Sequence, residues 1–510
     1  MAYLLTFDMG TTSLKASLFD EKLNIVADTG NEYQLSTPAK DIVELDAAVY
    51  WDVVKQAVSE LLVESEIDAS EVVSITCTTQ GETLIPIDFG GNVLSAAIVW
   101  IDARAQDESD FFIERIGHDD FFKTTGIPEI GPANPICKLK WYKDKMPDVY
   151  ADTDKFLLLE DYLIYKLTGQ KVTNLPLIAT TGYLNINTDE LYDEVFEIAG
   201  LDKNKIPRIL KSGTQAGSIT AQAADELGLS QNAVVTTVGI DQVCTAIGAG
   251  NIKEGVVSEV TGTCLVVAAT TDKPVYDMDK KMTYLKHYDD RFLILPYCTT
   301  AGIIFKWFKD TFCDMEAALA KEQGISVYDI LTDMAQLVPA GSDGLTLMPH
   351  FAGKLSPDTN IDATGVFSGV TLGSTKAHFV RAILEGVAFM LRENIEFIES
   401  FGIAIDQIRS VGGGANSDFW NQIKADVSGK QIIKMKHGEA ASLGAAILGA
   451  VSCNFYDSVE QACEQLIDVN KSYSPNSANQ TKYDKYYSVF MSLYNNMLPV
   501  YEAAKLAESK

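Results

Sequence analysis

The chain has 510 residues, 70 of them acidic and 41 basic, with a formal net charge of −29. This length predicts roughly two to four domains with large hydrophobic cores. The acidic balance and the absence of Lys/Arg runs argue against nucleic-acid and anionic membrane surfaces as partners, because both require clustered positive charge. Eight cysteines without a CxxC pair, and an N-terminus without signal-peptide features, predict reduced thiols in a cytoplasmic protein.

Apolar runs and alternating patterns predict strands interleaved with helices, which indicates an α/β protein. The predicted strands span 3–7, 14–18, 23–27, 72–77, 98–101, 255–260 and 265–269. The predicted helices follow Asp46, a good N-cap residue, and span 160–167, 377–401 and 417–427. The first three strands form an antiparallel meander.

A turn rich in glycine and threonine occurs twice, about half a chain apart. Gly10-Thr11 follows the first strand, and Thr261-Gly262-Thr263 separates two apolar strands in the second half. Because each turn opens a segment of similar size, we interpret the pattern as an internal duplication. The predicted domains are residues 1–250 and 251–510.

The first of these turns has the groups that are needed to hold phosphate. Gly10 allows close approach of the backbone, Thr11 and Thr12 offer hydroxyl and amide donors, and Lys15 offers a positive charge. Asp8 offers a carboxylate for Mg²⁺. The spacing is not that of a Walker A loop, and an ordinary hairpin turn is the alternative for this segment taken alone.

A run of glycines precedes one of the later helices. Gly412-Gly413-Gly414-Ala415 follows an apolar stretch, and Ser417 is the predicted N-cap of the next helix. A glycine turn at a helix N-terminus admits an anion or a flat ligand against the backbone. We therefore favour nucleotide contact over a simple tight turn.

Polar residues follow several of the predicted strands. Asp241 ends an apolar strand, where its carboxylate either faces a site or caps the next helix; for an arbitrary Asp, capping is the favoured interpretation. Gln80-Gly81-Glu82 and Trp100-Ile101-Asp102-Ala103-Arg104 also follow strands. Their side chains suit the binding of hydroxyl groups, or are ordinary polar residues at strand ends.

Together these motifs resemble the FGGY carbohydrate kinases of the actin/Hsp70/sugar-kinase superfamily, over nearly the whole chain. The most specific match is to the C-terminal signature, at 365–370 and 378–385. The N-terminal signature is matched through 135–141, where Ala133 and Tyr142 depart from the usual residues. The resemblance implies two actin-like (ribonuclease H-like) α/β domains, each with a mixed five-stranded sheet, flanking an ATP/sugar cleft. The first domain would carry most of the sugar site and the second most of the nucleotide site.

The resemblance also implies roles for individual residues. Asp241 would be the base that takes a proton from the sugar hydroxyl, and Asp8 and Asp241 would hold Mg²⁺. The residues implied to bind the sugar are Gln80, Gly81, Glu82, Asp102, Asp241 and Gln242. The residues implied to bind ATP are Thr11, Thr12, Lys15, Thr261, Gly262, Thr263, Gly302, Gly412, Gly413, Gly414, Ala415 and Ser417.

The residue pair Gly81-Glu82 bears on the identity of the sugar. Xylulokinase-like members carry Met-His in this slot, and glycerol-kinase-like members carry Arg-Glu. Glu82 can accept hydrogen bonds from two hydroxyls, and Gly81 is expected to leave room for a longer substrate. Chain length and the Trp100-x-Asp102-x-Arg104 element favour a xylulokinase-like enzyme. The expected substrate is a pentulose such as xylulose, with glycerol, gluconate and other polyols as alternatives.

Two other classes of function are alternatives to a sugar kinase. An actin/Hsp70-like ATPase would have no use for Gln80, Glu82 and Asp102 as a hydroxyl-binding set. A catalytically inactive sugar-binding regulator is disfavoured by intact Asp8, Lys15 and Asp241. The expected partners are ATP, Mg²⁺ and a small-molecule sugar, with no nucleic acid and no membrane, and a homodimer is one expectation for the assembly.

Overall fold

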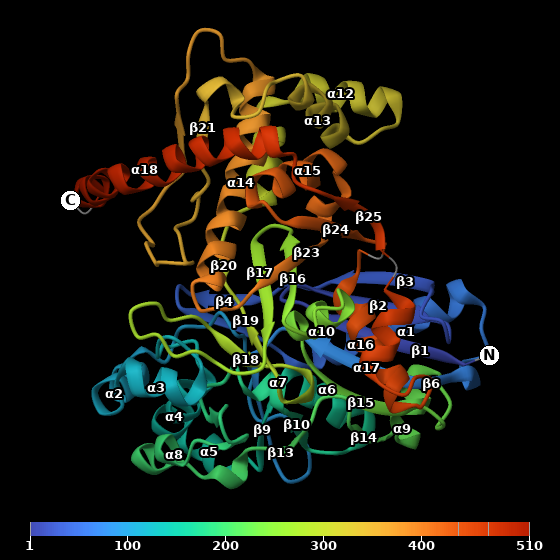
Figure 1. The fold of residues 1–510 in the computed structure, drawn as a ribbon. Coiled ribbons are helices and arrows are strands. Elements are labelled where there is room, and N and C mark those ends of the chain that lie inside the picture. The colour runs from blue at the N-terminus through green and yellow to red at the C-terminus, as the bar shows by residue number, and fades with distance from the viewer. Residues whose placement is uncertain (1, 437, 468, 509–510) are drawn as a thin grey trace. The chain divides into compact units, whose positions relative to one another are not determined.

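The computed structural model describes residues 2–436, 438–467 and 469–508. The chain divides into two compact units, whose elements are labelled in Figure 1. Unit 1 comprises Met1–Ile252, Asp272–Leu293 and Glu439–Ile467, and unit 2 comprises Lys253–Thr271, Ile294–Gly438 and Asp468–Lys510. Unit 1 is thus completed by two segments from the second half of the sequence. The division of function between residues 1–250 and 251–510 stays a prediction.

The main sheet of unit 1 has six strands in the order β14-β15-β6-β1-β2-β3. In chain order these are β1 (Tyr3–Met9), β2 (Ser13–Phe19), β3 (Ile25–Glu32), β6 (Val72–Thr79), β14 (Gln215–Ser218) and β15 (Val234–Ile240). The strands β1, β2 and β3 pair antiparallel, as predicted, and β1, β6 and β15 run parallel. The antiparallel edge strand β14 extends the expected five-stranded sheet to six. The first strand is longer than expected, so that Asp8 lies within β1, opposite Lys15, and not in the turn.

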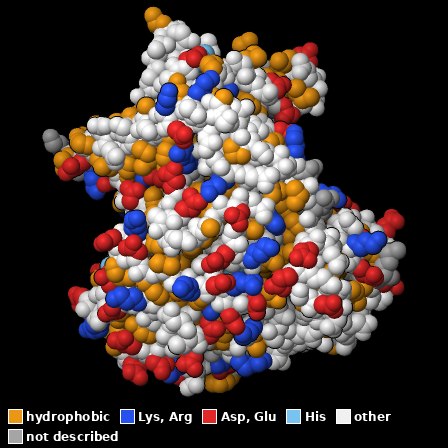
Figure 2. All heavy atoms as spheres, viewed as in Figure 1, with side chains coloured by type: hydrophobic (Ala, Val, Ile, Leu, Met, Phe, Trp, Pro, Cys, Tyr) orange, Lys and Arg blue, Asp and Glu red, His pale blue; other side chains and the backbone are white. Residues whose placement is uncertain are grey.

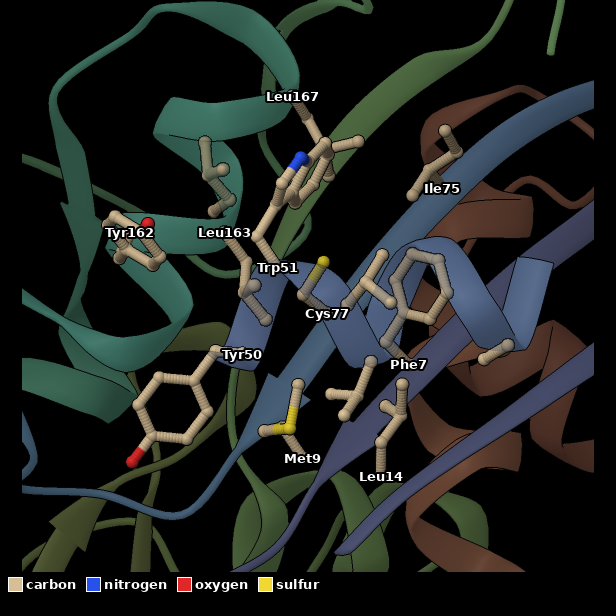
Figure 3. Packing of buried hydrophobic residues seen from close by; sticks show 14 of the residues in the cluster. Phe7, Met9, Leu14, Tyr50, Trp51, Ile75, Cys77, Tyr162, Leu163 and Leu167 are labelled. Carbon is tan, nitrogen blue, oxygen red and sulfur yellow. The ribbon is translucent and has the colours of Figure 1, made fainter. Parts of the chain in front are cut away.

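The helices that cover this sheet come from several parts of the chain. They are α1 (Ala47–Ser65), α6 (Leu159–Thr168), α9 (Ala221–Leu227), α10 (Asp241–Gly248) and α16 (Ala440–Ser452). Asp46 caps α1 as predicted, and its carboxylate accepts a hydrogen bond from the Ala48 N–H at 3.0 Å. Figure 3 shows Tyr50 and Trp51 of α1 packed among Phe7 of β1 and Leu163 of α6.

Helices α10 and α16 meet through two glycines. A Cβ atom on Gly248 would lie 1.9 Å from the Ala440 carbonyl oxygen, and one on Gly444 would lie 1.9 Å from the Cys244 carbonyl oxygen. Any side chain at either position would push the two helices apart. The residue that follows β15, Asp241, therefore begins a helix whose place is set by a segment from the far end of the sequence.

A second, smaller sheet of unit 1 has the order β4-β5-β8-β7-β9. Its strands are β4 (Ser36–Ala39), β5 (Ile42–Leu45), β7 (Leu84–Ile87), β8 (Ala97–Ile98) and β9 (Lys155–Leu158). The remaining helices and short strands of unit 1 are α2 (Gln106–Arg115), α3 (Gly117–Thr125), α4 (Pro135–Lys145), α5 (Pro147–Asp152), β10 (Val172–Asn174), α7 (Leu175–Ile178), β11 (Leu184–Asn185), β12 (Glu190–Leu191), α8 (Asp193–Ala199), β13 (Arg208–Leu210), β18 (Tyr284–Lys286) and α17 (Val459–Leu466).

The central strands of unit 2 follow the same plan as those of unit 1. They are β16 (Gly255–Thr261), β17 (Leu265–Thr271), β20 (Tyr297–Cys298), β23 (Ile405–Val411), β24 (Gln431–Met435) and β25 (Val469–Tyr473). Strand β16 pairs antiparallel with β17 and parallel with β23, which pairs parallel with β24. The strands β1, β2, β6 and β15 of unit 1 have the same order and directions. The predicted duplication is thus visible in the topology.

The helices of unit 2 include the two predicted from the sequence in this region. They are α11 (Gly302–Phe312), α12 (Asp314–Gln323), α13 (Val327–Gln336), α14 (Lys376–Glu399), α15 (Asp418–Ser428) and α18 (Ser477–Glu508), beside the hairpin of β21 (Thr346–Met348) and β22 (Val366–Ser368). No helix among the described residues is both long and apolar enough to cross a membrane. On the face drawn in Figure 2, basic side chains are interspersed among acidic ones.

Candidate functional site

Three polar segments meet at one edge of the main sheet of unit 1. Asp8 on β1 and Gly239 on β15 are both paired with Thr78 on β6, so the three strands end in register. Beyond these ends lie Gln80-Gly81-Glu82 after β6, and Asp241 after β15. The carboxyl ends of parallel strands are where α/β sheets bind ligands. The fold therefore brings together residues that are far apart in the sequence.

The carboxylates at this edge influence one another. Burial raises the pKa of Asp241 to about 7, and the charges of Asp8 and Glu82 add to this increase. Burial likewise raises the pKa of Asp8 to about 6, against the opposing charge of Lys15. The pKa of Glu82 is raised by burial and lowered in part by the Lys138 ammonium. Such a group of acidic side chains favours a cation or hydroxyl donors as ligands.

The interpretation of Asp241 as a helix cap is wrong in this structure. Asp241 is the first residue of α10, and the N-cap position belongs to Ile240. The carboxylate is half-buried at the sheet edge instead of closing the helix end. Its neighbour Gln242 is also half-buried.

A loop after β8 approaches the phosphate turn of unit 1. The indole N–H of Trp100 donates a hydrogen bond to the Thr11 hydroxyl at 3.0 Å, and the Trp100 side chain is 36% exposed. The buried ammonium of Lys138 donates to the carbonyl oxygens of Val99 and Trp100, at 3.0 and 3.1 Å. The expected strand at 98–101 ends early, at Ile98, and the chain then turns, with the Asp102 N–H donating to the Val99 carbonyl at 2.9 Å. Lys138 thus ties this loop to Glu82.

The environment of Gly81 differs from the expectation of extra room. A Cβ atom built on Gly81 would lie 3.0 Å from Ile240 Cδ1 and 3.4 Å from Thr180 Oγ1. The space beside this glycine is filled by protein and not by solvent. Gly81 therefore allows two segments to pack closely, while Gln80, which is 5% exposed, lies inside the same edge.

Asp102 is a predicted sugar ligand that the structure buries completely. Its side chain is 0% exposed. Its carboxylate accepts hydrogen bonds from the Val43 N–H at 2.6 Å and from the Arg104 guanidinium at 2.8 to 3.0 Å. The Arg104 guanidinium also bonds Glu44 at 3.0 Å. Because these bonds occupy the carboxylate, Asp102 holds the loop in shape in this structure and does not offer an oxygen to a ligand.

The phosphate turn of unit 1 forms a hairpin as the sequence predicts. The Gly10 N–H donates to the Ser13 carbonyl at 2.9 Å. Thr11 is half-buried and Thr12 exposed. The ammonium of Lys15 lies 2.7 Å from a carboxylate oxygen of Glu439, both side chains being about half exposed, at 54% and 42%. A phosphate approaching Lys15 would exchange this surface ion pair, which contributes little free energy, for a charge-assisted contact.

Three predicted nucleotide segments meet in one cavity of unit 2. The cavity has a volume of about 540 Å³. Its predicted lining residues are Thr261, Gly262, Thr263, Gly302, Gly413, Gly414 and Ser417. Gly412 and Ala415 belong to the same glycine turn but do not line the cavity. Two distant turns and the start of α11 are thus brought around a space of the size that small-molecule sites have.

The glycines of this cavity are required by close backbone contacts. A Cβ atom on Gly302 would lie 2.4 Å from the Gly262 carbonyl oxygen. One on Gly414 would lie 2.6 Å from the Thr261 Cβ. The Gly302 N–H also donates to the Gly262 carbonyl at 2.8 Å. Glycine at these positions lets the start of α11 and the glycine turn close on the Thr261-Gly262-Thr263 turn.

Sequence reasoning missed another part of the cavity lining. It comes from α11, from α13 and from the residue that caps α13, and it comprises Ile303, Phe305, Lys306, Ser326, Tyr328, Asp329 and Thr332. Phe305 stands edge-on to Tyr328, with ring centroids 5.1 Å apart, and edge-on to Trp420 at 6.2 Å. Aromatic walls of this kind suit a flat ring system. The only signal in the sequence is two amphipathic helices, and that pattern does not distinguish a cavity wall from ordinary core.

The carboxylates at the strand ends also suit Mg²⁺, the metal that the family resemblance implies. Among the described residues, no three His, Cys, Asp or Glu side chains form a group that could hold a metal ion by themselves. Mg²⁺ is usually bound by one or two carboxylates together with substrate phosphates. Asp8 and Asp241 are two carboxylates close enough for the charge of Asp8 to raise the pKa of Asp241. They match that pattern.

Comparisons with known proteins agree with this geometry. The model of the FGGY family of carbohydrate kinases matches its N-terminal domain to residues 3–248 and its C-terminal domain to residues 257–453. A xylulose kinase of Staphylococcus epidermidis is 28% identical over 496 residues, covering 96% of each chain. A gluconokinase of Bacillus licheniformis is 27% identical over 493 residues, covering 96% of this chain and 95% of its own.

A similar solved structure is a ligand-bound xylulose kinase from Lactobacillus acidophilus. It superposes with a TM-score of 0.88 at 25% sequence identity, covering 99% of this chain and 100% of its own. The family models together span most of the chain, on both sides of residue 250. The α/β fold, the duplicated topology and the converging motifs all fit this match. The chain belongs to the FGGY family of carbohydrate kinases, and it is an ATP-dependent sugar kinase.

Proposed function

We propose that this kinase phosphorylates a neutral open-chain sugar, and that a pentulose such as xylulose is its substrate. The observation that carries the proposal is the acidic character of the sheet edge formed by Asp8, Glu82 and Asp241. The relatives named above include both xylulose kinases and a gluconokinase at similar identity. Similarity alone therefore does not decide between a neutral sugar and a sugar acid, and the acidic charge of the site supports the neutral sugar.

The three basic side chains described above are engaged by the protein. Lys138 is buried and bonds two carbonyl oxygens, Arg104 bonds Asp102 and Glu44, and Lys15 pairs with Glu439. The carboxylate of a sugar acid would meet acidic side chains here. Two like charges 4 Å apart repel by about 4 kcal/mol at the effective dielectric constant near a protein surface. A neutral sugar avoids this cost and supplies hydroxyl donors to the carboxylates.

In this proposal, Asp241 accepts the proton of the attacking hydroxyl, since an alcohol is a poor nucleophile until a positioned base takes its proton. Glu82, with Gln80 and Gln242, binds and orients the other hydroxyls. Asp8 and Asp241 would hold Mg²⁺, which would neutralise phosphate charge. In this proposal Asp102 does not contact the sugar, and its hydrogen bonds to Val43 and Arg104 keep the loop after β8 in shape.

The nucleoside and the phosphates of the nucleotide are assigned to different groups of residues. The cavity of unit 2 binds the nucleoside, and its lining includes Gly413, Ser417 and the aromatic residues of α11 and α13. Within unit 2, the turn Thr261-Gly262-Thr263 supplies hydroxyl and amide donors for phosphate. Within unit 1, Thr11, Thr12 and Lys15 supply hydroxyl, amide and ammonium donors for phosphate.

An assay of phosphorylated product with ATP across ketoses, aldoses, polyols and sugar acids tests the proposal. We expect the highest kcat/KM with a pentulose and poor turnover of gluconate. Xylitol is the matched control for xylulose, because it has the same chain length without the carbonyl group. Gluconate as the best substrate would contradict the charge argument, and turnover of ATP without stimulation by any sugar would contradict the assignment of Glu82 and Asp241 to sugar.

Replacing Glu82 by alanine should weaken the use of sugar while leaving the KM for ATP unchanged. Loss of a charged hydrogen-bond partner costs about 1.5–3 kcal/mol, which lowers kcat/KM for sugar by about one to two orders of magnitude. Steady-state kinetics with each substrate varied in turn measure both effects. Because Lys138 loses its charged neighbour, the thermal midpoint is measured on the same preparation.

The matched control for this variant is Glu60→Ala. Glu60 lies on α1 and accepts a hydrogen bond from the Thr29 hydroxyl at 2.6 Å, away from the strand ends. Its loss should leave both KM values as they are. A wild-type kcat/KM for sugar in the Glu82→Ala enzyme would remove Glu82 from the site.

A further inference from the structure

A buried carboxylate behind the sheet edge has no place in the proposed chemistry. Glu160 lies on α6 and is 0% exposed. One of its oxygens accepts hydrogen bonds from the N–H groups of Val238 at 2.8 Å and Gly239 at 3.2 Å. The other accepts from the Gly239 N–H at 3.1 Å and from the Asn174 side-chain amide at 2.8 Å. Burying a carboxylate costs free energy unless its oxygens accept hydrogen bonds, and both oxygens of Glu160 do so.

The backbone that Glu160 holds is the irregular end of β15. The pairing of β15 with β6 shifts register between Thr236 and Gly239. Gly239 has a φ of +115°, and a Cβ atom there would lie 2.8 Å from Pro176 Cβ. The Thr78 hydroxyl donates to the Gly239 carbonyl at 2.9 Å. The Gly239 residue is therefore held from both sides, two residues before Asp241. Bulges at strand ends commonly direct a side chain toward an active site.

The same carboxylate also reaches the sugar side of the site through Asn174. The Asn174 side-chain oxygen accepts a hydrogen bond from the Leu177 N–H at 3.0 Å and caps α7. This short helix leads directly to Thr180, whose hydroxyl lies 3.4 Å from the position of a Cβ on Gly81. Glu160 thus connects the segment that carries Asp241 with the segment that packs against Gly81-Glu82.

Every polar partner of Glu160 is a hydrogen-bond donor. The Val238 and Gly239 amides donate on one side and the Asn174 amide on the other. Burial raises the pKa of Glu160 to about 7, while these donors oppose the increase. A glutamine at this position presents an N–H group to one set of donors in either orientation of its amide. Replacing Glu160 by glutamine therefore disturbs the hydrogen-bond geometry, although the two side chains have nearly the same shape.

We propose that Glu160 is a positioning residue that sets the placement of Asp241, through the Gly239 bulge, and of the Gly81-Glu82 segment, through Asn174. The inference rests on the proposed role of Asp241 as the base. Positioning residues act by keeping the reacting groups in a productive geometry, and a displacement of about 1 Å can cost about 10²-fold in rate. Glu160 therefore affects kcat although it touches no substrate.

The test is Glu160→Gln, assayed with the best sugar and ATP at a temperature well below the thermal midpoint of the variant. We expect kcat to fall by at least about 10-fold, with the KM for ATP unchanged. The matched control is Asp161→Asn, the neighbouring carboxylate on α6. Asp161 is also 0% exposed, and it bonds the Leu158 N–H at 2.9 Å, at the start of its own helix. We expect Asp161→Asn to lower the thermal midpoint and to leave kcat near wild type.

A reciprocal exchange separates positioning from stability. In the double variant Glu160→Gln/Asn174→Asp, the introduced glutamine amide can donate to the introduced aspartate, which caps α7 as well as an asparagine does. We expect this exchange to restore most of the lost kcat. Glu160→Asp, which keeps the charge but is one methylene shorter, is used if Glu160→Gln does not fold, and its kcat should fall as well.

The outcomes distinguish this inference from the proposed function. Wild-type kcat in folded Glu160→Gln, or in folded Glu160→Asp where only that variant folds, overturns the positioning role, and so does a double variant that folds without regaining activity. If Asp241→Asn loses turnover in the same assays, only the inference about Glu160 has failed. If Asp241→Asn keeps wild-type turnover, the base assignment is wrong and the positioning role is overturned with it.

Discussion

Asp241→Asn is expected to lower kcat by at least about 10²-fold, the lower range for loss of a positioned general base. The asparagine amide can still hydrogen-bond the sugar hydroxyl, but it cannot accept its proton. The two side chains are nearly isosteric, so packing at the start of α10 is retained. The loss should therefore appear in kcat more than in the KM of either substrate. Steady-state kinetics and the thermal midpoint are measured on the same purified variant.

Two comparisons make this experiment decisive. Asp241 does not occupy the N-cap of α10, so a change in helix capping does not explain a loss of activity. Gln242→Ala at the next position is the control for local disturbance, and its effect should fall on the KM for sugar. Wild-type kcat in Asp241→Asn would refute the assignment of the base.

Removal of Mg²⁺ is expected to abolish turnover. The net charge of −29 and the two carboxylates Asp8 and Asp241 leave the protein unable to neutralise a triphosphate by its general field. A metal ion stabilises transferring phosphate by several kcal/mol, so its removal should lower the rate by about 10³-fold or more. Product is quantified directly by chromatography, because enzymes that couple ADP release to absorbance themselves use Mg²⁺.

Titration with EDTA followed by excess Mg²⁺ should show full loss and full recovery. The variant Asp8→Asn should require more Mg²⁺ for half-maximal turnover, whereas Asp28→Asn, at an exposed position of strand β3, should not. Undiminished activity in metal-free buffer would contradict the assignment of Asp8 and Asp241 as metal ligands.

Local sequence patterns predicted much of the framework. The alternation at 14–18 and the N-cap Asp46 led to β2 and α1, and both are present. The turns at Gly10 and Gly262 marked the two related units, and each directly follows a central strand, β1 or β16. The early end of the strand at Ile98 was not predicted, and the Val99 carbonyl just beyond it bonds Lys138, a residue remote in the sequence.

The roles of particular side chains depended more on distant contacts. The sequence favoured a longer pocket at Gly81, but Ile240 and Thr180 fill that space. Asp102 suited a hydroxyl ligand by its position after a strand, yet Arg104 and Val43 occupy its carboxylate. Ile240, Thr180 and Val43 cannot be identified from local periodicity, because they are brought near only by the pairing of strands and the closing of loops. Arg104 is two residues from Asp102, but the sequence does not show that their side chains bond.

By itself, the sequence determined the α/β class, the duplication, the family resemblance and most of the segments that carry polar chemistry. Spacing of glycines and strand-end carboxylates is a local property, and it is therefore readable along the chain. Only the tertiary structure decided that α16 completes unit 1, that α11 and α13 form part of the cavity lining, and that Glu160 supports the backbone just before Asp241. These are contacts between segments remote in sequence, and their selection depends on how the cores pack as a whole.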